Sequence, residues 1–119
     1  MEKNILIVED EMIIALMLDQ MVTKQGHNVI DKVSTGEAAV ESAQRHKPDL
    51  ILMDIRLGGQ LDGIQAMQKI NEQNPTSVIF VTGNSDDSYK KRIKEIDHLA
   101  FLTKPVTFHE LSRSLSAAS

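Results

Sequence analysis

Apolar residues form five short runs along the chain, and segments with helical periodicity separate these runs. The runs have strand length, are rich in Ile, Leu and Val, and are bounded by polar or turn-forming residues, which is typical of buried strands. We therefore predict strands over residues 4–8, 28–33, 49–53, 77–81 and 99–102. The second run contains more polar residues than the others and fits an edge of a sheet.

The segments between the strands carry the start and stop signals of helices. We predict helices over about 11–25, 34–46, 62–73, from 85 or 86 to 96, and from 107 onward. Ser34 and Glu37 have the capping-box spacing, and so do Thr107 and Glu110, while Asp62 can serve as an N-cap. Strands that alternate with helices predict a doubly wound α/β fold with a parallel sheet covered on both faces. Without a repeat or a domain-sized linker, residues 1–119 are expected to form a single domain.

Composition excludes several classes of protein. The chain has no Cys, which rules out disulfides and thiolate metal sites. No apolar run approaches the length of a membrane span, and the N-terminus does not resemble a secretory signal, so we expect a cytoplasmic protein without a membrane partner. A net charge of −4, no Trp and one Tyr argue against direct nucleic-acid binding. The six Met residues are expected to pack in the core.

Polar side chains that could bind a metal, bind phosphate or act as a nucleophile follow four of the predicted strands. In chain order these residues are Glu9, Asp10, Asp54, Thr82 and Lys104, the last followed by Pro105. The carboxyl ends of parallel strands meet at one edge of a sheet, so these side chains should converge there. Three crowded carboxylates repel one another, and an oxygen-only ligand set points to Mg²⁺ over Zn²⁺.

The remaining side chains of this set suit a phosphoryl group. A lysine serves as a point charge for phosphate oxygens, and a threonine hydroxyl can donate a hydrogen bond to them. An aspartate can act as a nucleophile and form an aspartyl-phosphate. Asp54, which directly follows the most apolar predicted strand, is the candidate for that role.

The set Glu9-Asp10, Asp54, Thr82-Gly83 and Lys104-Pro105 resembles the receiver domain of two-component response regulators, over residues 3 to about 117. The resemblance implies a flavodoxin-like fold with strand order 2-1-3-4-5. It also implies that Asp54 accepts a phosphoryl group from a sensor histidine kinase or phosphotransfer protein. The domain would then control a downstream output protein or domain, and a phosphorylation-dependent homodimer is one form such control takes.

The resemblance further assigns roles at the site. Asp10 would bind Mg²⁺ directly, Glu9 through water, and Asp54 and the Arg56 backbone carbonyl would complete the metal ligands. Thr82 and Lys104 would bind the phosphoryl oxygens. In a second role, Thr82 would act as a switch together with Phe101, which could also be an ordinary core residue. The Lys104–Pro105 peptide would be cis, and positions 56 and 84 (Arg56 and Asn84) would tune dephosphorylation.

Two segments depart from the family pattern. Residues 57–63 contain glycines where the family usually has a proline, and they are about one residue longer, so this loop is expected to be more mobile. Asp97-His98 stand where a Gly-Ala pair is usual. A basic cluster, defined as Lys90, Lys91, Arg92 and Lys94, is either a solvated helix face or a docking surface for an acidic partner.

Two other functions remain open at this point. One is a Mg²⁺-dependent phosphohydrolase that forms an aspartyl-phosphate. Such enzymes usually carry a second aspartate two residues after the nucleophile, where this chain has Arg56. The other is a pseudo-receiver scaffold that works without phosphorylation. In the leading interpretation the domain is not an enzyme, because it catalyses only its own phosphotransfer and autodephosphorylation.

Overall fold

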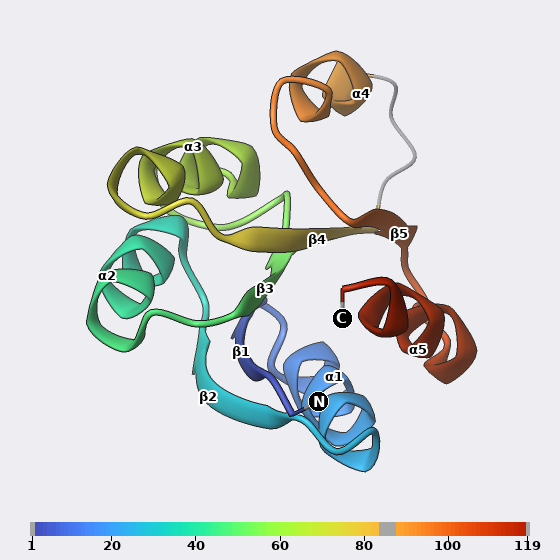
Figure 1. Ribbon diagram of the computed structural model, residues 1–119. Coiled ribbons are helices and arrows are strands. Elements are labelled where there is room, and N and C mark those ends of the chain that lie inside the picture. Colours follow the sequence, from blue (N-terminus) through green and yellow to red (C-terminus); the bar gives the residue numbers. More distant parts are fainter. Residues whose placement is uncertain (1, 84–87, 119) are drawn as a thin grey trace.

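The chain folds into a parallel sheet between two layers of helices. The structure, a computed structural model, describes residues 2–83 and 88–118. Its strands are β1 Asn4–Val8, β2 Asn28–Val33, β3 Leu50–Asp54, β4 Ser77–Thr82 and β5 Ala100–Thr103. Its helices are α1 Met12–Lys24, α2 Gly36–His46, α3 Gly63–Gln73, α4 Ser88–Ile93 and α5 Phe108–Ala117. Neighbouring strands pair in parallel in the order β2-β1-β3-β4-β5 (Figure 1), which confirms the predicted flavodoxin-like fold.

The two faces of the sheet are covered by different helices. Helices α1 and α5 lie on one face, and α2, α3 and α4 lie on the other (Figure 1). Side chains alternate across each strand, so Ile51 and Met53 of β3 face α2 and α3, whereas Leu50 and Leu52 face α1 and α5. Every residue of β3 is buried, which makes this central strand a rigid support for its last residue, Asp54.

Two of the three predicted helix caps are confirmed. Asp62 begins α3 and Thr107 begins α5, each in a capping box with the residue three positions later. The predicted cap at Ser34 is wrong, because the side chain of the next residue, Thr35, accepts the hydrogen bond from Ala38 N at 3.1 Å. Glu37 does not complete a box and instead binds a loop from another part of the chain.

The bounds of β1 and β2 match the predictions, whereas boundaries of the other elements differ by up to three residues. Strands β3 and β5 each lie one residue later than predicted, and β4 extends to Thr82. Backbone hydrogen bonds from Ile55 N to Val81 O and from Lys104 N to Thr82 O continue the pairing past the apolar runs. Helix α4 ends at Ile93 rather than 96, and its predicted start at 85 or 86 lies outside the described residues.

The segment between β3 and α3, here called the β3–α3 loop and defined as residues 55–62, has several anchors. Gly63 N donates a hydrogen bond of 2.7 Å to Ile55 O and closes the loop at its base. Glu37 Oε1 accepts a hydrogen bond of 2.9 Å from Leu61 N, which ties the loop to the start of α2. The mobility expected from its glycines is therefore opposed by contacts that no sequence spacing predicts.

Candidate functional site

The predicted polar residues converge at the carboxyl edge of the sheet. Glu9 and Asp10 directly follow β1, Asp54 ends β3, Thr82 ends β4, and Lys104 directly follows β5. Because β1, β3, β4 and β5 are consecutive neighbours in the sheet, their ends bring these side chains together. Glu9, Asp54 and Thr82 are buried, whereas Asp10 is exposed.

Three carboxylates form a cluster with the donor chemistry of a cation site. One oxygen from each of Glu9, Asp10 and Asp54 lies within 4.8 Å of the others. Carboxylate oxygens without nitrogen or sulfur ligands suit a hard divalent cation, and Mg²⁺ usually retains several waters beside one or two carboxylates. The exposure of Asp10 leaves one side of the cluster accessible to such waters.

Lys104 connects two of these carboxylates. Its Nζ lies 2.8 Å from Glu9 Oε1, and it donates a hydrogen bond of 3.1 Å to Asp54 Oδ2. The remaining oxygens accept backbone hydrogen bonds, Glu9 Oε2 from Glu11 N and Asp54 Oδ1 from Arg56 N. Glu9 Oε1 is buried, and its contact with Lys104 lacks the geometry of a hydrogen bond. A buried carboxylate oxygen left in this state can accept a cation or a water, and the cluster therefore fits Mg²⁺.

Burial and charge set the protonation of the site. Burial, and then the charge of Glu9, raise the pKa of Asp54 to about 7, while Lys104 opposes the rise. Burial alone would lower the pKa of the Lys104 ammonium. The contacts with Glu9 and Asp54 outweigh that effect, so its pKa lies above the ordinary value. Lys104 is therefore a cation across the physiological range, and the protonation of Asp54 changes near neutral pH.

Phe101 lies near the site but faces the core. It is partly buried, pairs in register with Phe80 of β4, and packs with Ile93 and Tyr89 in the cluster beneath α4. This position serves an ordinary core residue and a switch residue equally well. The Lys104–Pro105 peptide is cis, as the resemblance implied.

The comparisons with known proteins decide the family. The model of the response regulator receiver domain matches residues 5–116. This chain belongs to that family. As a receiver domain it is a module of two-component signal transduction, and such domains interact with histidine kinases and output domains. Receiver domains are generally not enzymes themselves, and they bind Mg²⁺ at an acidic pocket, for which this chain has the carboxylate cluster.

Individual relatives agree with this assignment. The receiver domain is 30% identical over 116 residues to the transcriptional regulatory protein PdtaR of Mycobacterium tuberculosis, covering 98% of this chain and 56% of that protein. It is 36% identical over 81 residues to the chemotaxis protein CheY of Thermotoga maritima, covering 68% and 67% of the two chains. The signal receiver domain of a modulated diguanylate cyclase from Desulfovibrio desulfuricans G20 matches with a TM-score of 0.92 at 32% identity, over 99% and 94% of the two chains. The chain spans about half the length of relatives such as PdtaR.

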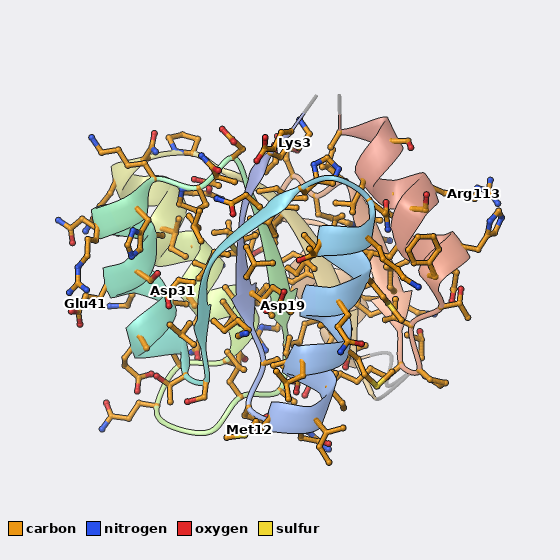
Figure 2. All side chains as sticks on the ribbon, turned by 90° about the horizontal axis from the view of Figure 1, so that it is seen from below. Lys3, Met12, Asp19, Asp31, Glu41 and Arg113 are labelled. Atoms are coloured by element: carbon orange, nitrogen blue, oxygen red, sulfur yellow. The ribbon has the colours of Figure 1, made fainter. Side chains whose placement is uncertain are left out.

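An apolar surface beside the site was missed by the sequence patterns. Met12, Ile13, Leu16 and Met17 of α1, here called the α1 patch, are 77%, 75%, 48% and 44% exposed. Met12 lies at the N-terminal end of α1 (Figure 2). The prediction that the Met residues pack in the core is thus wrong for Met12 and Met17, and Met1 lies outside the described residues. Next to the patch, an apolar cavity of about 270 Å³ is lined by Met17, Met21, Pro105 and Val106, and by Lys104 of the site.

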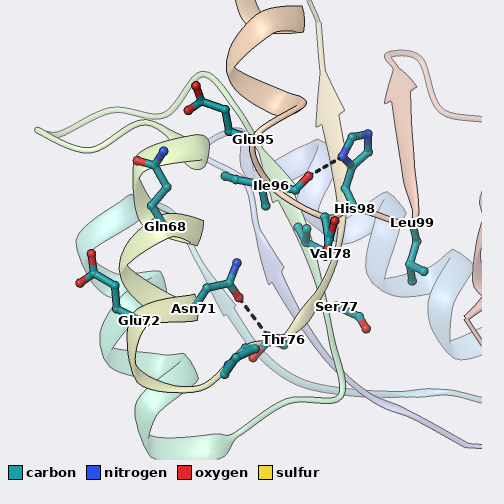
Figure 3. Close-up of a pocket in the computed structure, with 12 residues that line it drawn as sticks. Gln68, Asn71, Glu72, Thr76, Ser77, Val78, Glu95, Ile96, His98 and Leu99 are labelled. Atoms are coloured by element: carbon teal, nitrogen blue, oxygen red, sulfur yellow. Dashed lines mark hydrogen bonds between the residues drawn. The ribbon is translucent and has the colours of Figure 1, made fainter.

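Another cavity lies at the opposite edge of the sheet. It measures about 840 Å³ and lies between α3 and the amino ends of β4 and β5. Two of its residues make local hydrogen bonds, with Thr76 N donating to Asn71 Oδ1 and His98 Nδ1 contacting Ile96 O (Figure 3). The ring of His98 also meets the ring of Phe80 edge-on, with 5.9 Å between the ring centroids. None of the carboxylates of the site lines this cavity.

Two expected features of the site stay predictions. The amide of Arg56 binds Asp54, but the role of its backbone carbonyl as a metal ligand stays a prediction. Asn84, expected to tune dephosphorylation, lies outside the described residues.

Within the described residues, no helix combines the length and apolarity that crossing a membrane requires.

Proposed function

We propose that residues 1–119 act as a single receiver domain that accepts a phosphoryl group on Asp54 and signals through the resulting change in conformation. One observation carries this proposal. The carboxylate of Asp54 is buried, bonded to Lys104 at 3.1 Å, and grouped with two other carboxylates within 4.8 Å. A site of this kind combines a nucleophile, a fixed cation and the ligands for a second cation.

The transfer step follows from these contacts. A carboxylate oxygen of Asp54 attacks the phosphorus of a phosphohistidine, the new P–O bond forms, and the P–N bond breaks with the electron pair leaving on the imidazole. Lys104 is placed to neutralise charge on the transferring oxygens, because its Nζ already contacts the attacking group. Mg²⁺, held by Glu9, Asp10, Asp54 and the Arg56 carbonyl, would supply further charge neutralisation and alignment.

The conformational response would begin at Thr82. Its hydroxyl, at the end of β4 beside Asp54, would move to donate a hydrogen bond to the phosphoryl group, and Phe101 would turn into the space released. A phosphoryl group shifts such an equilibrium only through contacts that differ between the two states. Inverting a 1:99 ratio requires about 5.5 kcal/mol. Two or three charge-assisted hydrogen bonds of about 1.5–3 kcal/mol each are sufficient.

The partners follow from the same surface. A phosphohistidine on a sensor histidine kinase or phosphotransfer protein must come within bonding distance of Asp54. The α1 patch lies beside Lys104 through the shared apolar cavity, which supports it as the docking surface for that donor. A downstream output protein or domain would read the switched state, with a phosphorylation-dependent homodimer as one form of output.

Intact-mass measurement after incubation with acetyl phosphate and Mg²⁺ tests the proposal. We expect the wild type to gain one phosphoryl group and Asp54→Asn to gain none. Asp97→Asn, which alters an exposed aspartate away from the site, should behave as wild type. A wild type that stays unmodified would favour the pseudo-receiver scaffold. Continuous turnover of a small phosphomonoester would favour the phosphohydrolase, although Arg56 occupies the position of the second aspartate that such enzymes use.

A further inference from the structure

An ion pair joins α4 to the beginning of α3. Arg92 Nη2 lies 2.8 Å from Asp62 Oδ2, and the two side chains are 40% and 26% exposed. The other oxygen of Asp62 accepts a hydrogen bond of 2.8 Å from Gln65 N, and Gln65 Oε1 accepts one of 3.0 Å from Asp62 N. Asp62 is therefore held in place by the capping box. One member of the basic cluster thus has a partner within the domain.

Helix α4 depends on tertiary contacts to hold its position. It spans six residues, Ser88–Ile93, and a helix of this length is not stable without tertiary contacts. Its apolar support consists of Ile93, with Ile96 in the following turn and a partly buried Tyr89. Lys91, on the same helix, is exposed. The Arg92–Asp62 ion pair is therefore one of the tertiary contacts that position this element.

Both segments joined by the pair lead directly from the phosphoacceptor site. Thr82 ends β4, and α4 is the next helix along the chain. On the other side, the β3–α3 loop runs from Asp54 to Asp62, and the hydrogen bond from Gly63 N to Ile55 O fixes its two ends to each other. The ion pair thus connects α4, which would move, to the β3–α3 loop, which is anchored next to Asp54.

We propose that the Arg92–Asp62 ion pair is a latch that holds α4 in its resting position and opposes the switch. This inference rests on the proposed function, in which phosphorylation of Asp54 draws Thr82 inward. The latch stabilises the resting arrangement, and part of the differential binding energy of the phosphoryl group is needed to release it. The strength of the Arg92–Asp62 pair therefore contributes to the free energy that phosphorylation must supply to switch the domain.

Titration with beryllofluoride, a phosphoryl mimic, at fixed Mg²⁺ tests the latch. Tyr89 lies on α4 and is the single Tyr in a chain without Trp, so its fluorescence reports on this helix. Asp62→Asn removes the charge and keeps a good N-cap, and Arg92→Gln removes the other partner. Each variant should lower the beryllofluoride concentration for half-maximal change by about two- to five-fold, the size expected for a partly exposed pair. The double variant should change it no further, and Lys91→Gln, a matched loss of charge on α4, should leave it unchanged.

Several results would overturn the latch. Single variants whose half-maximal beryllofluoride concentration equals that of the wild type would do so. A double variant in which the two single effects multiply would also do so, because substitutions at independent sites are additive in free energy. A double-mutant cycle in urea without beryllofluoride provides a separate reading, since a true latch couples positions 62 and 92 in the resting protein. If Asp54→Asn responded to beryllofluoride as wild type does, the proposed function would fail, and the latch with it. A normal wild-type response with unchanged variants would reject the latch alone.

Discussion

Lys104 Nζ lies 3.1 Å from Asp54 Oδ2, although 50 residues separate the two in the sequence. The same ammonium lies 2.8 Å from Glu9 Oε1, and both carboxylate side chains are at most 3% exposed. One cation therefore offsets two buried negative charges. A lysine placed in this way stabilises the resting site, and its positive charge is also available to a phosphoryl group on Asp54.

Replacing Lys104 by Gln should destabilise the domain, because Glu9 and Asp54 would remain buried without their counter-charge. Loss of one member of a buried pair costs about 3–5 kcal/mol, and protonation of Asp54 near neutral pH should reduce this to about 1–3 kcal/mol. Urea unfolding at pH 8 measures the difference. Lys32→Gln, which breaks the more exposed pair with Asp19, is the control and should cost less than about 1 kcal/mol. Equal effects of the two substitutions would contradict this account of the site.

The raised pKa of Asp54 predicts a specific dependence of stability on pH. The pKa rises from 3.8 in the unfolded chain to about 7 in the fold, so between these values the folded state binds more protons. The contribution of Asp54 to stability is therefore present at low pH and is lost as pH rises through 7. A pKa difference of this size corresponds to at most about 4 kcal/mol. Asp54→Asn should thus stabilise the metal-free domain at pH 8 relative to wild type, and much less so at pH 5.

Mg²⁺ should reverse this trend. Ligand carboxylates must be deprotonated to bind a cation, so the affinity should increase as pH rises through about 7. Unfolding curves at pH 5.5 and pH 8, with and without Mg²⁺, would show a larger gain in stability at pH 8. Removal of the cation with a chelator should cancel that gain. A gain of equal size at both pH values would mean that Asp54 does not take part in binding.

Thr82 provides a test of the switch that is separate from phosphorylation itself. Thr82→Ala removes the hydroxyl, whereas Thr82→Ser keeps it at a position that is completely buried. We expect the Ala variant to accept phosphate on Asp54 but to need about ten- to a hundred-fold more beryllofluoride for the Tyr89 response, since a charge-assisted hydrogen bond contributes about 1.5–3 kcal/mol. The Ser variant should stay close to wild type. Equal responses of the Ala and Ser variants would assign the hydroxyl no part in switching.

Gly63 is required by close contact at the base of the β3–α3 loop. A Cβ at this position would lie 2.1 Å from Asp54 O and 2.9 Å from Ile55 Cα, which are backbone atoms that cannot move aside. Gly63→Ala should therefore destabilise the domain by about 3 kcal/mol or more and slow phosphorylation, because the carbonyl belongs to Asp54, the proposed phosphoacceptor. Gly58→Ala in the same loop is the control, since a Cβ there meets nothing within 4 Å. Thermal unfolding and acetyl phosphate labelling measure the two effects.

The α1 patch should matter for a protein donor and not for a small one. A double substitution of Met12 and Ile13 by Ser removes apolar surface that is mostly exposed, so stability should change little. Phosphotransfer from a phosphorylated histidine phosphotransfer protein that labels the wild type should slow about tenfold or more, since central apolar contacts at interfaces contribute about 2 kcal/mol. Labelling by acetyl phosphate should be unchanged. Phe108→Ser, an exposed apolar residue on α5, is the matched control, and an equal effect there would contradict a specific docking surface.

Local patterns in the sequence were sufficient for the fold and for the members of the site. Apolar runs of strand length predict β1 and β3 within one residue, because burial on both faces demands such runs. The convergence of Glu9, Asp54 and Lys104 follows from one topological rule, that parallel strands present the same ends at the same edge. Caps at Asp62 and Thr107 were predictable because a capping box depends on residues three apart.

The tertiary structure decided which of these residues contact each other and which remain exposed. The choice of Thr35 over Ser34 as a cap, the tie from Glu37 to Leu61, and the exposure of Met12 depend on segments that are distant in the sequence. So does the ion pair of Arg92 with Asp62, which a charge count would assign to a solvated cluster. Spacing along a chain specifies faces and periods, but distances between separate elements arise only when the sheet and its helices pack together. The acidic site of this receiver domain was therefore predictable from its sequence, whereas the contacts that hold its residues in place are defined only by the fold.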